Sequence, residues 1–187
     1  IERDARAAYR PGFTARIASP FFIARFEVTQ AQWQSVMGNN PSAFNAATLG
    51  ADTSRHPVDS ITWEQAKEFV RRLNRLEATD AYRLPTEFEW ETAAAGLAIE
   101  GNLLDMNQLH PRSATDATCV APAQLFGDVW EWTASAYLPY PGFRTSPGAV
   151  GEYNGKFMVN QQVLRGGSCL TPPGHVRPTY RNFFPPS

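Results

Sequence analysis

The sequence predicts a single α+β domain in which irregular segments take up roughly half of the chain, above the usual ~40%. Three observations lead to this prediction. Several segments carry the start signal of a helix, two others have the composition of strands, and turn-forming residues outnumber periodic stretches after Leu97. No linker, internal repeat or low-complexity segment divides the chain. We therefore expect one domain over residues 1–187.

Three helices are predicted from capping boxes, in which a Thr hydroxyl accepts from the third helical amide while a Gln or Glu side chain returns the bond. The boxes are Thr29–Gln32, Thr62–Gln65 and Thr86–Glu89. The first helix is short and ends at Gly38, and the second runs from about 63 to 76. The second has its apolar residues at three- and four-residue steps, which is typical of a half-buried helix. The third begins after Pro85 and fades near Gly96.

Strands are predicted at Phe21–Val28 and Gln161–Arg165, which contain aromatic and β-branched residues. Between them, Leu125–Phe143 holds tryptophans and tyrosines among Gly and Pro residues, and we interpret it as an irregular, aromatic-walled loop. The two glycines after Arg165 permit close backbone approach because they lack a Cβ atom. The aromatic loop and this Arg-Gly-Gly segment are expected to meet at one site.

Composition excludes several classes of function. The chain has 187 residues, a net charge of −1 and no basic stripe, so nucleic acid is not an expected partner. No apolar run is long enough to span a bilayer, and the start at Ile1 has neither a Met nor the pattern of a signal segment. Two cysteines, Cys119 and Cys169, are too few for a disulfide scaffold, and we interpret both as packed, reduced thiols.

Five motifs resemble the formylglycine-generating-enzyme-type domain, also called the sulfatase-modifying-factor domain, in their order and spacing over about residues 20–184. They are FEVTQAQWQSVMGNNPSAF, HPVDSITWEQAKEFVRRLN, YRLPTEFEWETAAAG, GDVWEWTAS and VLRGGS. The resemblance implies an α+β, variant C-type-lectin-like fold. Thr171 and Val176 occupy the positions of the copper-binding cysteines of a formylglycine-generating enzyme. Neither residue supplies a thiolate, so copper-dependent cysteine oxidation is not expected.

The second half is more similar to the C-terminal domain of the hercynine oxygenases, the iron-dependent sulfoxide synthases of ergothioneine biosynthesis. The segments are GNLLDMNQLHP, AQLFGDVWEWTASAYLPYPGF, GEYNGKFM and QQVLRGGSCLTPPGHVRPTYRNFFPP. Such enzymes are bacterial oxidoreductases that join a small-molecule thiol to trimethylhistidine with O₂. The resemblance implies that this domain forms the wall that binds the thiol, in a cytoplasmic protein.

Iron is held in that family by three histidines on a separate N-terminal helical domain. This chain has His56, His110 and His175, each in a different motif and without the spacing of an iron site. We therefore expect Fe²⁺ only from a separate helical domain or a partner chain. The closing strand that the family implies would lie beyond Ser187.

Tyr137 and Tyr140 are the candidate catalytic residues. They lie three residues apart in a loop that contains proline, so both phenols can point into one cleft, where a phenol donates a proton or a hydrogen bond to an oxygen species. The alternative is that the two rings only pack beneath the loop.

The candidate substrate-binding residues include a fork of arginines that would bind a substrate carboxylate. The fork consists of Arg165, Arg177 and Arg181. Structural pairing of these arginines with Glu131, Glu152 or Asp128 is the alternative. By resemblance, Asn182, Phe183 and Phe184 line the thiol pocket, and the alternative is a plain hydrophobic terminus.

Glu131 lies between two tryptophans, and an isolated carboxylate in such surroundings is costly to desolvate. The resemblance implies a Ca²⁺ site here, and its mapped ligands are Gln124, Gly127, Val129 and Glu131, all oxygen donors. Gln124 replaces the more usual Asn. An ion pair between Glu131 and an arginine is the alternative.

Two functions are compatible with these features. The first is the substrate-binding part of a hercynine-oxygenase-like enzyme, and the second is a non-catalytic ligand-binding or accessory module on the same fold, because a fold does not fix a function.

Overall fold

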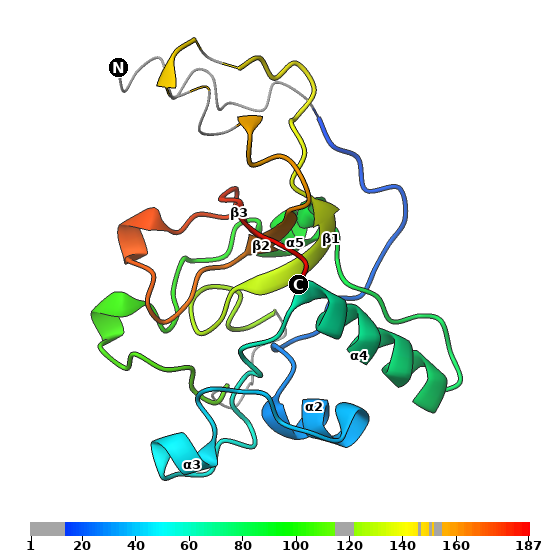
Figure 1. Ribbon diagram of the computed structural model, residues 1–187, viewed down its shortest axis with the longest axis vertical. Helices are drawn as coiled ribbons and strands as arrows, with labels where there is room; N and C mark the ends of the chain where they lie inside the picture. The colour runs from blue at the N-terminus through cyan, green and yellow to red at the C-terminus, as the bar shows by residue number, and fades with distance from the viewer. Residues whose placement is uncertain (1–13, 115–121, 146, 150, 152–154) are drawn as a thin grey trace.

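The computed structural model describes residues 14–114, 122–145, 147–149, 151 and 155–187. Short helices lie around a small antiparallel sheet, and long irregular segments connect them (Figure 1). The elements are α2 (Gln30–Met37), α3 (Ala46–Leu49), α4 (Trp63–Leu76), α5 (Glu87–Ala94), η1 (Leu104–Met106), β1 (Glu131–Ala136), β2 (Gln162–Arg165), η2 (Pro173–His175) and β3 (Asn182–Phe184). The predicted α+β class is confirmed.

The three predicted helices are present, and each begins with the expected capping box. Thr29, Thr62 and Thr86 accept from the third helical amide, and the Gln or Glu at that position reaches back to the cap. Gly38 ends α2 in the left-handed conformation, with a φ of 85° that favours glycine. The local sequence therefore determines where these helices start, whatever packs against them.

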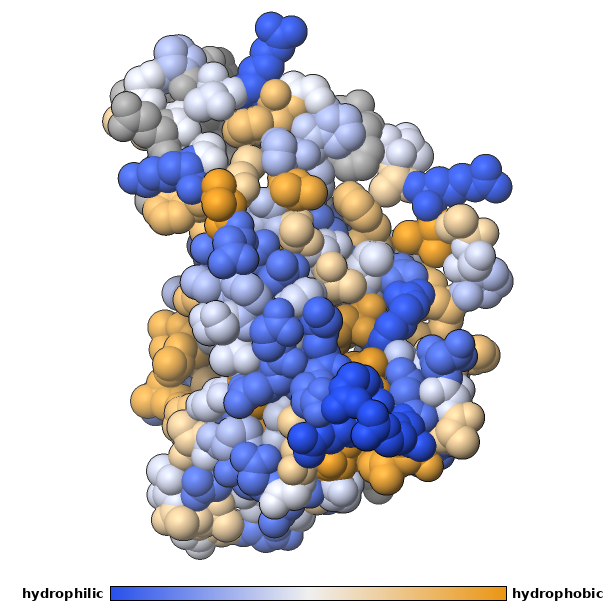
Figure 2. Space-filling view, turned by 45° about the vertical axis from the view of Figure 1, so that its right-hand side comes forward, coloured by the Kyte–Doolittle hydropathy of each residue, from blue (hydrophilic) through white to orange (hydrophobic). Residues whose placement is uncertain are grey.

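The helices α2 and α4 pack together below the sheet in the view of Figure 1. Trp33 and Phe69 stack with their ring centroids 5.1 Å apart and their planes nearly parallel. Val58 completes this buried cluster. The space-filling view is predominantly hydrophilic at the lower right, where α4 lies, which agrees with the predicted polar face of that helix (Figure 2).

The sheet has the strand order β1-β2-β3, with both pairs antiparallel. Glu131 pairs with Arg165, and Leu164 pairs with Asn182, so β2 is the central strand. The helix α5 packs against β1 and β2 (Figure 1). This arrangement brings the first residue of α5, Glu87, close to the end of β2.

Two predictions of secondary structure were wrong, one of a strand and one of an irregular loop. Phe21–Val28 is irregular, and the bridge next to it joins Thr29 to Pro57, where proline has no N–H to extend a ladder. Leu125–Phe143 is not wholly irregular, since β1 occupies its centre. Glycine and proline at both ends of that segment hid the strand, whereas Gln162–Arg165 was predicted correctly.

Two tryptophans attach α4 to β1. The indole nitrogen of Trp63 donates to the carbonyl of Thr133 over 2.8 Å, and the indole of Trp132 donates to the carbonyl of Ile61 over 3.1 Å. The residues in each pair are about 70 positions apart in sequence. These bonds connect the helical layer to the sheet.

The second buried cluster lies under the predicted Arg-Gly-Gly segment and contains Trp90, Leu125 and Phe126. A Cβ atom on Gly166 would lie 2.5 Å from the carbonyl oxygen of Leu125, so any larger residue would displace the backbone there. Gly166 has a φ of 97° as well. The predicted close backbone approach and the meeting of the two segments are both present.

The Arg83–Glu89 ion pair at the start of α5 makes an acid-sensitive contribution to stability. Arg83 donates to both carboxyl oxygens of Glu89 over 2.6 and 2.8 Å, and this lowers the pKa of Glu89 from 4.5 to about 2. A carboxyl group with a lowered pKa in the folded state stabilises above its unfolded pKa, and the contribution is lost as the pH falls towards the folded value. Glu89→Gln keeps the capping oxygen and removes the ion pair.

We expect Glu89→Gln to lower the free energy of unfolding by about 1 kcal/mol at neutral pH, since Arg83 is half-exposed. Urea melts at neutral pH and at about pH 3 should give a smaller difference at the lower pH. The matched control is Glu64→Gln, which removes only an exposed contact with Lys67. An equal cost for Glu89→Gln at both pH values would contradict the assignment.

Candidate functional site

A buried carboxylate, Glu87, lies at the centre of the predicted tyrosine and arginine region. Its side chain is almost inaccessible to solvent. It accepts a hydrogen bond from Arg165 over 2.9 Å and from the Tyr140 hydroxyl over 3.3 Å, and the Nε atom of Arg181 lies 2.8 Å from it. We call these four residues, together with Glu91, the Glu87 network. It joins α5, β2, the segment after β1 and the segment before β3.

Arg165 is fully buried and is not available to a substrate carboxylate. One terminal nitrogen donates to the backbone carbonyls of Pro178 and Tyr180, and the other donates to Glu87 and Glu91. The structure confirms structural pairing but corrects the partners. Glu131 and Asp128 do not bind this guanidinium, and the third candidate, Glu152, lies outside the described residues.

The predicted fork of three arginines is not formed. Arg165 is buried, Arg181 is largely enclosed by Glu87 and two tyrosines, and Arg177 is exposed, with its guanidinium 5.1 Å from the ring of Tyr180. The reason is that Glu87 and Glu91 already neutralise the two arginines at the centre. Only Arg177 presents its charge to solvent.

Tyr137 and Tyr140 have Arg181 as their common neighbour. The guanidinium carbon lies 4.6 Å from the ring centroid of Tyr137 and 4.3 Å from that of Tyr140. Such cation–π contacts are stabilising, the more so when they are partly desolvated. Burial raises the pKa of Tyr140 to about 12, so its phenol stays protonated at neutral pH and can donate a hydrogen bond.

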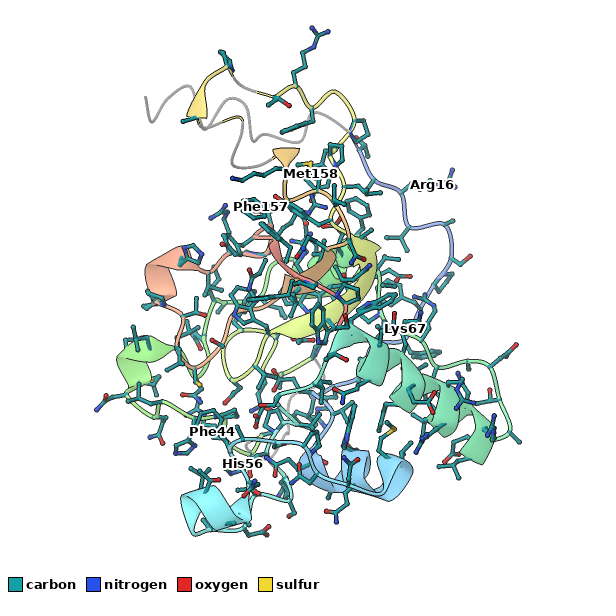
Figure 3. The ribbon with its side chains drawn as sticks, in the orientation of Figure 1. Arg16, Phe44, His56, Lys67, Phe157 and Met158 are labelled. Atoms are coloured by element: carbon teal, nitrogen blue, oxygen red, sulfur yellow. The ribbon has the colours of Figure 1, made fainter. Side chains whose placement is uncertain are left out.

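Phe183 is the predicted pocket residue that contacts this pair. Its ring stacks on Tyr137 with centroids 4.1 Å apart, and the ring centroid of Phe157, which Figure 3 labels, lies 5.8 Å from that of Phe183. Phe184 is more than half exposed. The side-chain oxygen of Asn182 accepts from the Phe183 amide, so this asparagine supports its own strand. One of the three predicted pocket residues therefore lies in the aromatic cluster.

The predicted calcium ligands lie around a second buried carboxylate group. The side-chain nitrogen of Gln124 donates to Asp128 over 3.0 Å and to the carbonyl of Arg112 over 3.2 Å. Gln124 binds one carboxyl oxygen of Asp128, and the other oxygen accepts from the Asn102 side chain and the Arg112 amide. Both oxygens are therefore occupied. Gln124 and Asp128 therefore support one another.

Among the described residues Glu131 forms no ion pair with an arginine, so they do not supply the alternative that was predicted for it. Its Oε1 atom is buried without a hydrogen-bond donor in the part of the chain that the structure describes. Burial raises the pKa of Glu131 to about 8, and the nearby Trp90 indole acts in the opposite direction. Arg165 lies opposite Glu131 in the pairing of β1 with β2, but its guanidinium turns towards α5.

Glu27 is a site residue that sequence reasoning missed. Both of its carboxyl oxygens are buried, and the backbone amide of Val129 lies beside the carboxyl group. Burial raises its pKa well above the usual value, and the charges of Glu131 and Asp128 raise it further. The available signal was a lone acidic residue within the apolar run Phe21–Val28.

The histidines and the cysteine occupy structural positions. His56 and His110 stack with centroids 6.2 Å apart beside Phe44, at the end of the molecule opposite Phe157 (Figure 3). Over the described ranges no group of three or more His, Cys, Asp and Glu side chains is arranged to hold a metal ion. Cys169 is a buried free thiol, and Cys119 lies outside the described residues.

Replacement of Arg165 should be far more costly than replacement of an exposed arginine of the same segment. Arg165→Met removes one of the two arginine partners of the buried Glu87, so we expect a loss of about 3 kcal/mol in the free energy of unfolding. Arg177→Met, the matched control, should change it by less than about 0.5 kcal/mol. Denaturant melts measure both. Equal losses would contradict a buried charge network.

Known proteins resemble this chain in sequence and in fold. The family model described as the sulfatase-modifying factor enzyme 1-like domain matches residues 2–121 and 105–187. A hercynine oxygenase of Mycolicibacterium smegmatis is 33% identical over 155 residues, which make up 70% of this chain and 34% of that protein. The chain thus spans about a third of the length of the hercynine oxygenases that it matches.

A chaperone protein, LppX, of Paenibacillus barcinonensis is 31% identical over 191 residues, with 85% of this chain and 61% of that protein covered. Among solved structures, PvdO from Pseudomonas aeruginosa superposes with a TM-score of 0.65 at 18% identity, over 96% of this chain and 82% of that one. At such low identity this likeness concerns the fold alone. It is consistent with the expected variant C-type-lectin-like fold. Among the residues described, no helix combines the length and apolar character that a membrane crossing requires.

Proposed function

Because this chain belongs to the family of sulfatase-modifying factor enzyme 1-like domains, we propose that it is the substrate-binding wall of a hercynine-oxygenase-like sulfoxide synthase. Such an enzyme is an iron(II)- and O₂-dependent oxidoreductase that forms a C–S bond between a small-molecule thiol and trimethylhistidine. The observation that carries the proposal is the pair of tyrosines held against Arg181. A cytoplasmic location belongs to the same proposal.

The role of the tyrosines follows from their surroundings. Tyr140 is anchored by Glu87 and Arg181, and its raised pKa keeps the proton on the phenol. The hydroxyl proton is held by Glu87, so donation to an oxygen species formed beside Tyr140 would exchange that hydrogen bond for one to the oxygen species. Tyr137 is fixed by Phe183 and Arg181, and we assign it to the same wall.

Iron does not fit the described residues. His56 and His110 pair with each other beside Phe44, whereas His175 packs on Tyr180, so the imidazoles do not converge. We assign the iron ligands to a separate helical domain or a partner chain. This chain then contributes binding of the thiol and placement of the phenols, and Arg177 is the exposed cation of this segment for a substrate carboxylate.

The full-length product of the natural gene should consume O₂ in the presence of a thiol and trimethylhistidine, while residues 1–187 alone should not. In the full-length protein, Tyr140→Phe should lower the rate by about 100-fold or more, because it removes a positioned proton donor. Tyr82→Phe is the control, since Tyr82 is exposed and lies on the segment between α4 and α5. Oxygen-electrode rates and product analysis measure the effect.

A non-catalytic accessory module is the second candidate. It is favoured by the internal use of Arg165 and Arg181 and by the relative named as a chaperone protein. A full-length protein that lacks a three-histidine helical domain and takes up no O₂ would support this function and end the enzymatic one.

We also propose a calcium ion at Glu131, as the family resemblance implies. The described donors fit a hard cation, because an unpartnered carboxyl oxygen of Glu131 lies close in sequence to the carbonyl groups of Gly127 and Val129. Neither carbonyl accepts a hydrogen bond within the described ranges. The ion would fix the backbone around the aromatic segment and would take no part in the chemistry. Ca²⁺ should therefore raise the melting temperature and a chelator should lower it, and a melt that responds to neither would overturn this site.

A further inference from the structure

His56 and His110 bring together two segments that are far apart in the sequence. Their ring centroids lie 6.2 Å apart, and the angle between their planes is 4°. The ring centroid of Phe44 lies 6.3 Å from that of His110. His56 belongs to the connection between α3 and α4, and His110 belongs to the segment that follows η1. Figure 3 shows Phe44 and His56 close together at the lower end of the molecule.

Gln30, the first residue of α2, holds the His56 side of this contact. Its backbone amide donates to the carbonyl of His56 over 2.9 Å, and its side-chain nitrogen donates to the carbonyl of Phe44 over 3.0 Å. Its side-chain oxygen accepts from Asn40 and Thr53. Because Gln30 is buried and fully bonded in this way, it fixes both aromatic residues to α2.

Asn102 and Asp128 hold the His110 side. The side-chain nitrogen of Asn102 donates to the carbonyl of His110 over 2.8 Å and to Asp128 over 2.7 Å. The Arg112 amide donates to the same carboxyl group over 2.9 Å. Within the described residues, no hydrogen bond joins the segment 101–114 to the segment 40–60. The ring contacts therefore join two parts of the chain whose hydrogen bonds are separate.

The carbonyl of Pro111 determines the tautomer of His110. The Nδ1 atom of His110 lies 2.8 Å from that carbonyl oxygen, which can only accept, so Nδ1 carries a proton. A second proton, on Nε2, would make this ring a cation. The Nδ1 atom of His56 is buried and has no hydrogen-bond partner in the part of the chain that the structure describes. An N–H group at that atom would therefore have no acceptor.

The groups around His56 act on its protonation in both directions. Burial lowers the pKa of His56 below its usual value of 6.5, and the charge of His110 lowers that pKa further. Three acidic residues lie near the ring pair or beside Phe44, namely Asp52, Asp59 and Asp128. The charges of Asp128 and Asp52 raise the pKa of His56, but their effects are smaller. A charged imidazole at position 56 is therefore disfavoured in the folded protein.

We propose that His56 and His110 form an acid-sensitive contact, which holds the segment after η1 against the connection between α3 and α4 at neutral pH and releases it when both rings are protonated. Two neutral rings pack without electrostatic cost, whereas two imidazolium ions at this separation repel each other. Because the pKa of His56 is lowered from 6.5 in the folded state, the folded protein binds fewer protons than the unfolded chain as the pH falls past that value. The stabilisation is therefore complete above the unfolded pKa and is lost as the pH falls towards the folded one.

Hydrogen–deuterium exchange of the full-length protein tests the contact. Peptides are followed by mass spectrometry at about pH 7.5 and about pH 5, and their rates are corrected for the intrinsic effect of pH on exchange. Peptides that cover residues 102–112 should exchange on the order of tenfold faster at the lower pH, the factor that one unit of pKa represents. Peptides over α4 should keep their protection, because the bonds of Asn102 and Arg112 to Asp128 limit the opening to this segment.

Substitutions in the pair separate the ring contact from the charge. His110→Phe and His56→Phe each keep an aromatic ring and remove one titrating group, so the segment should stay protected at both pH values. His175→Phe is the matched control and should keep the pH dependence, since His175 packs on Tyr180 outside the pair. Equal exchange of the wild-type segment at both pH values, or an equal loss of protection over α4, would overturn the contact even where a variant does not fold. An unchanged pH dependence in both folded variants would overturn it as well.

Discussion

The buried ion pair between Glu87 and Arg165 is the interaction on which the rest of the described structure depends. The two residues are 78 positions apart, and neither is accessible to solvent. Through it α5 is fixed to the sheet, and through Arg181 and Tyr140 the irregular segments on either side are fixed to α5. A fold with little regular structure needs such contacts, because short strands alone bury too few backbone groups to define one arrangement. The network contains two acids and two arginines, so the buried charges balance.

The sequence was sufficient for features that depend on neighbouring residues. The capping boxes predicted α2, α4 and α5 because Thr and the residue three places later interact within one turn. The strand predicted at Phe21–Val28 did not form because a strand needs a continuous partner, and this segment has only isolated backbone hydrogen bonds, to Val58 and Ala123, among the described residues. β1 was missed because its partner, β2, lies about 30 residues away in the sequence, and the local sequence does not reveal that partner. Pairing over such distances is not encoded in local composition.

In the candidate site too, contacts between residues close in sequence were predictable and contacts between distant residues were not. Tyr137 and Tyr140 were predictable as a pair because they share one short segment, and the structure places both on Arg181. The partners of Arg165 were not predictable, because Glu87 and Glu91 precede it by 78 and 74 positions in the sequence. Glu27 was hidden for a similar reason, because the Val129 amide beside its carboxyl group comes from a distant part of the sequence.

The charge balance at the two buried sites distinguishes their roles. Around Glu87 each carboxylate has an arginine, so the site is complete without a ligand and can hold tyrosines rigidly in place, as a catalytic wall requires. Around Glu131 the ion pairs of the described residues include no arginine, and its buried Oε1 atom has no hydrogen-bond donor there. The proposed calcium ion would supply the missing positive charge. The aromatic segment Leu125–Phe143 connects the two sites, because it carries Glu131 at one end of β1 and the tyrosines beyond the other. Loss of an ion at Glu131 would therefore reach the tyrosines through β1 itself, by loosening the strand that precedes them.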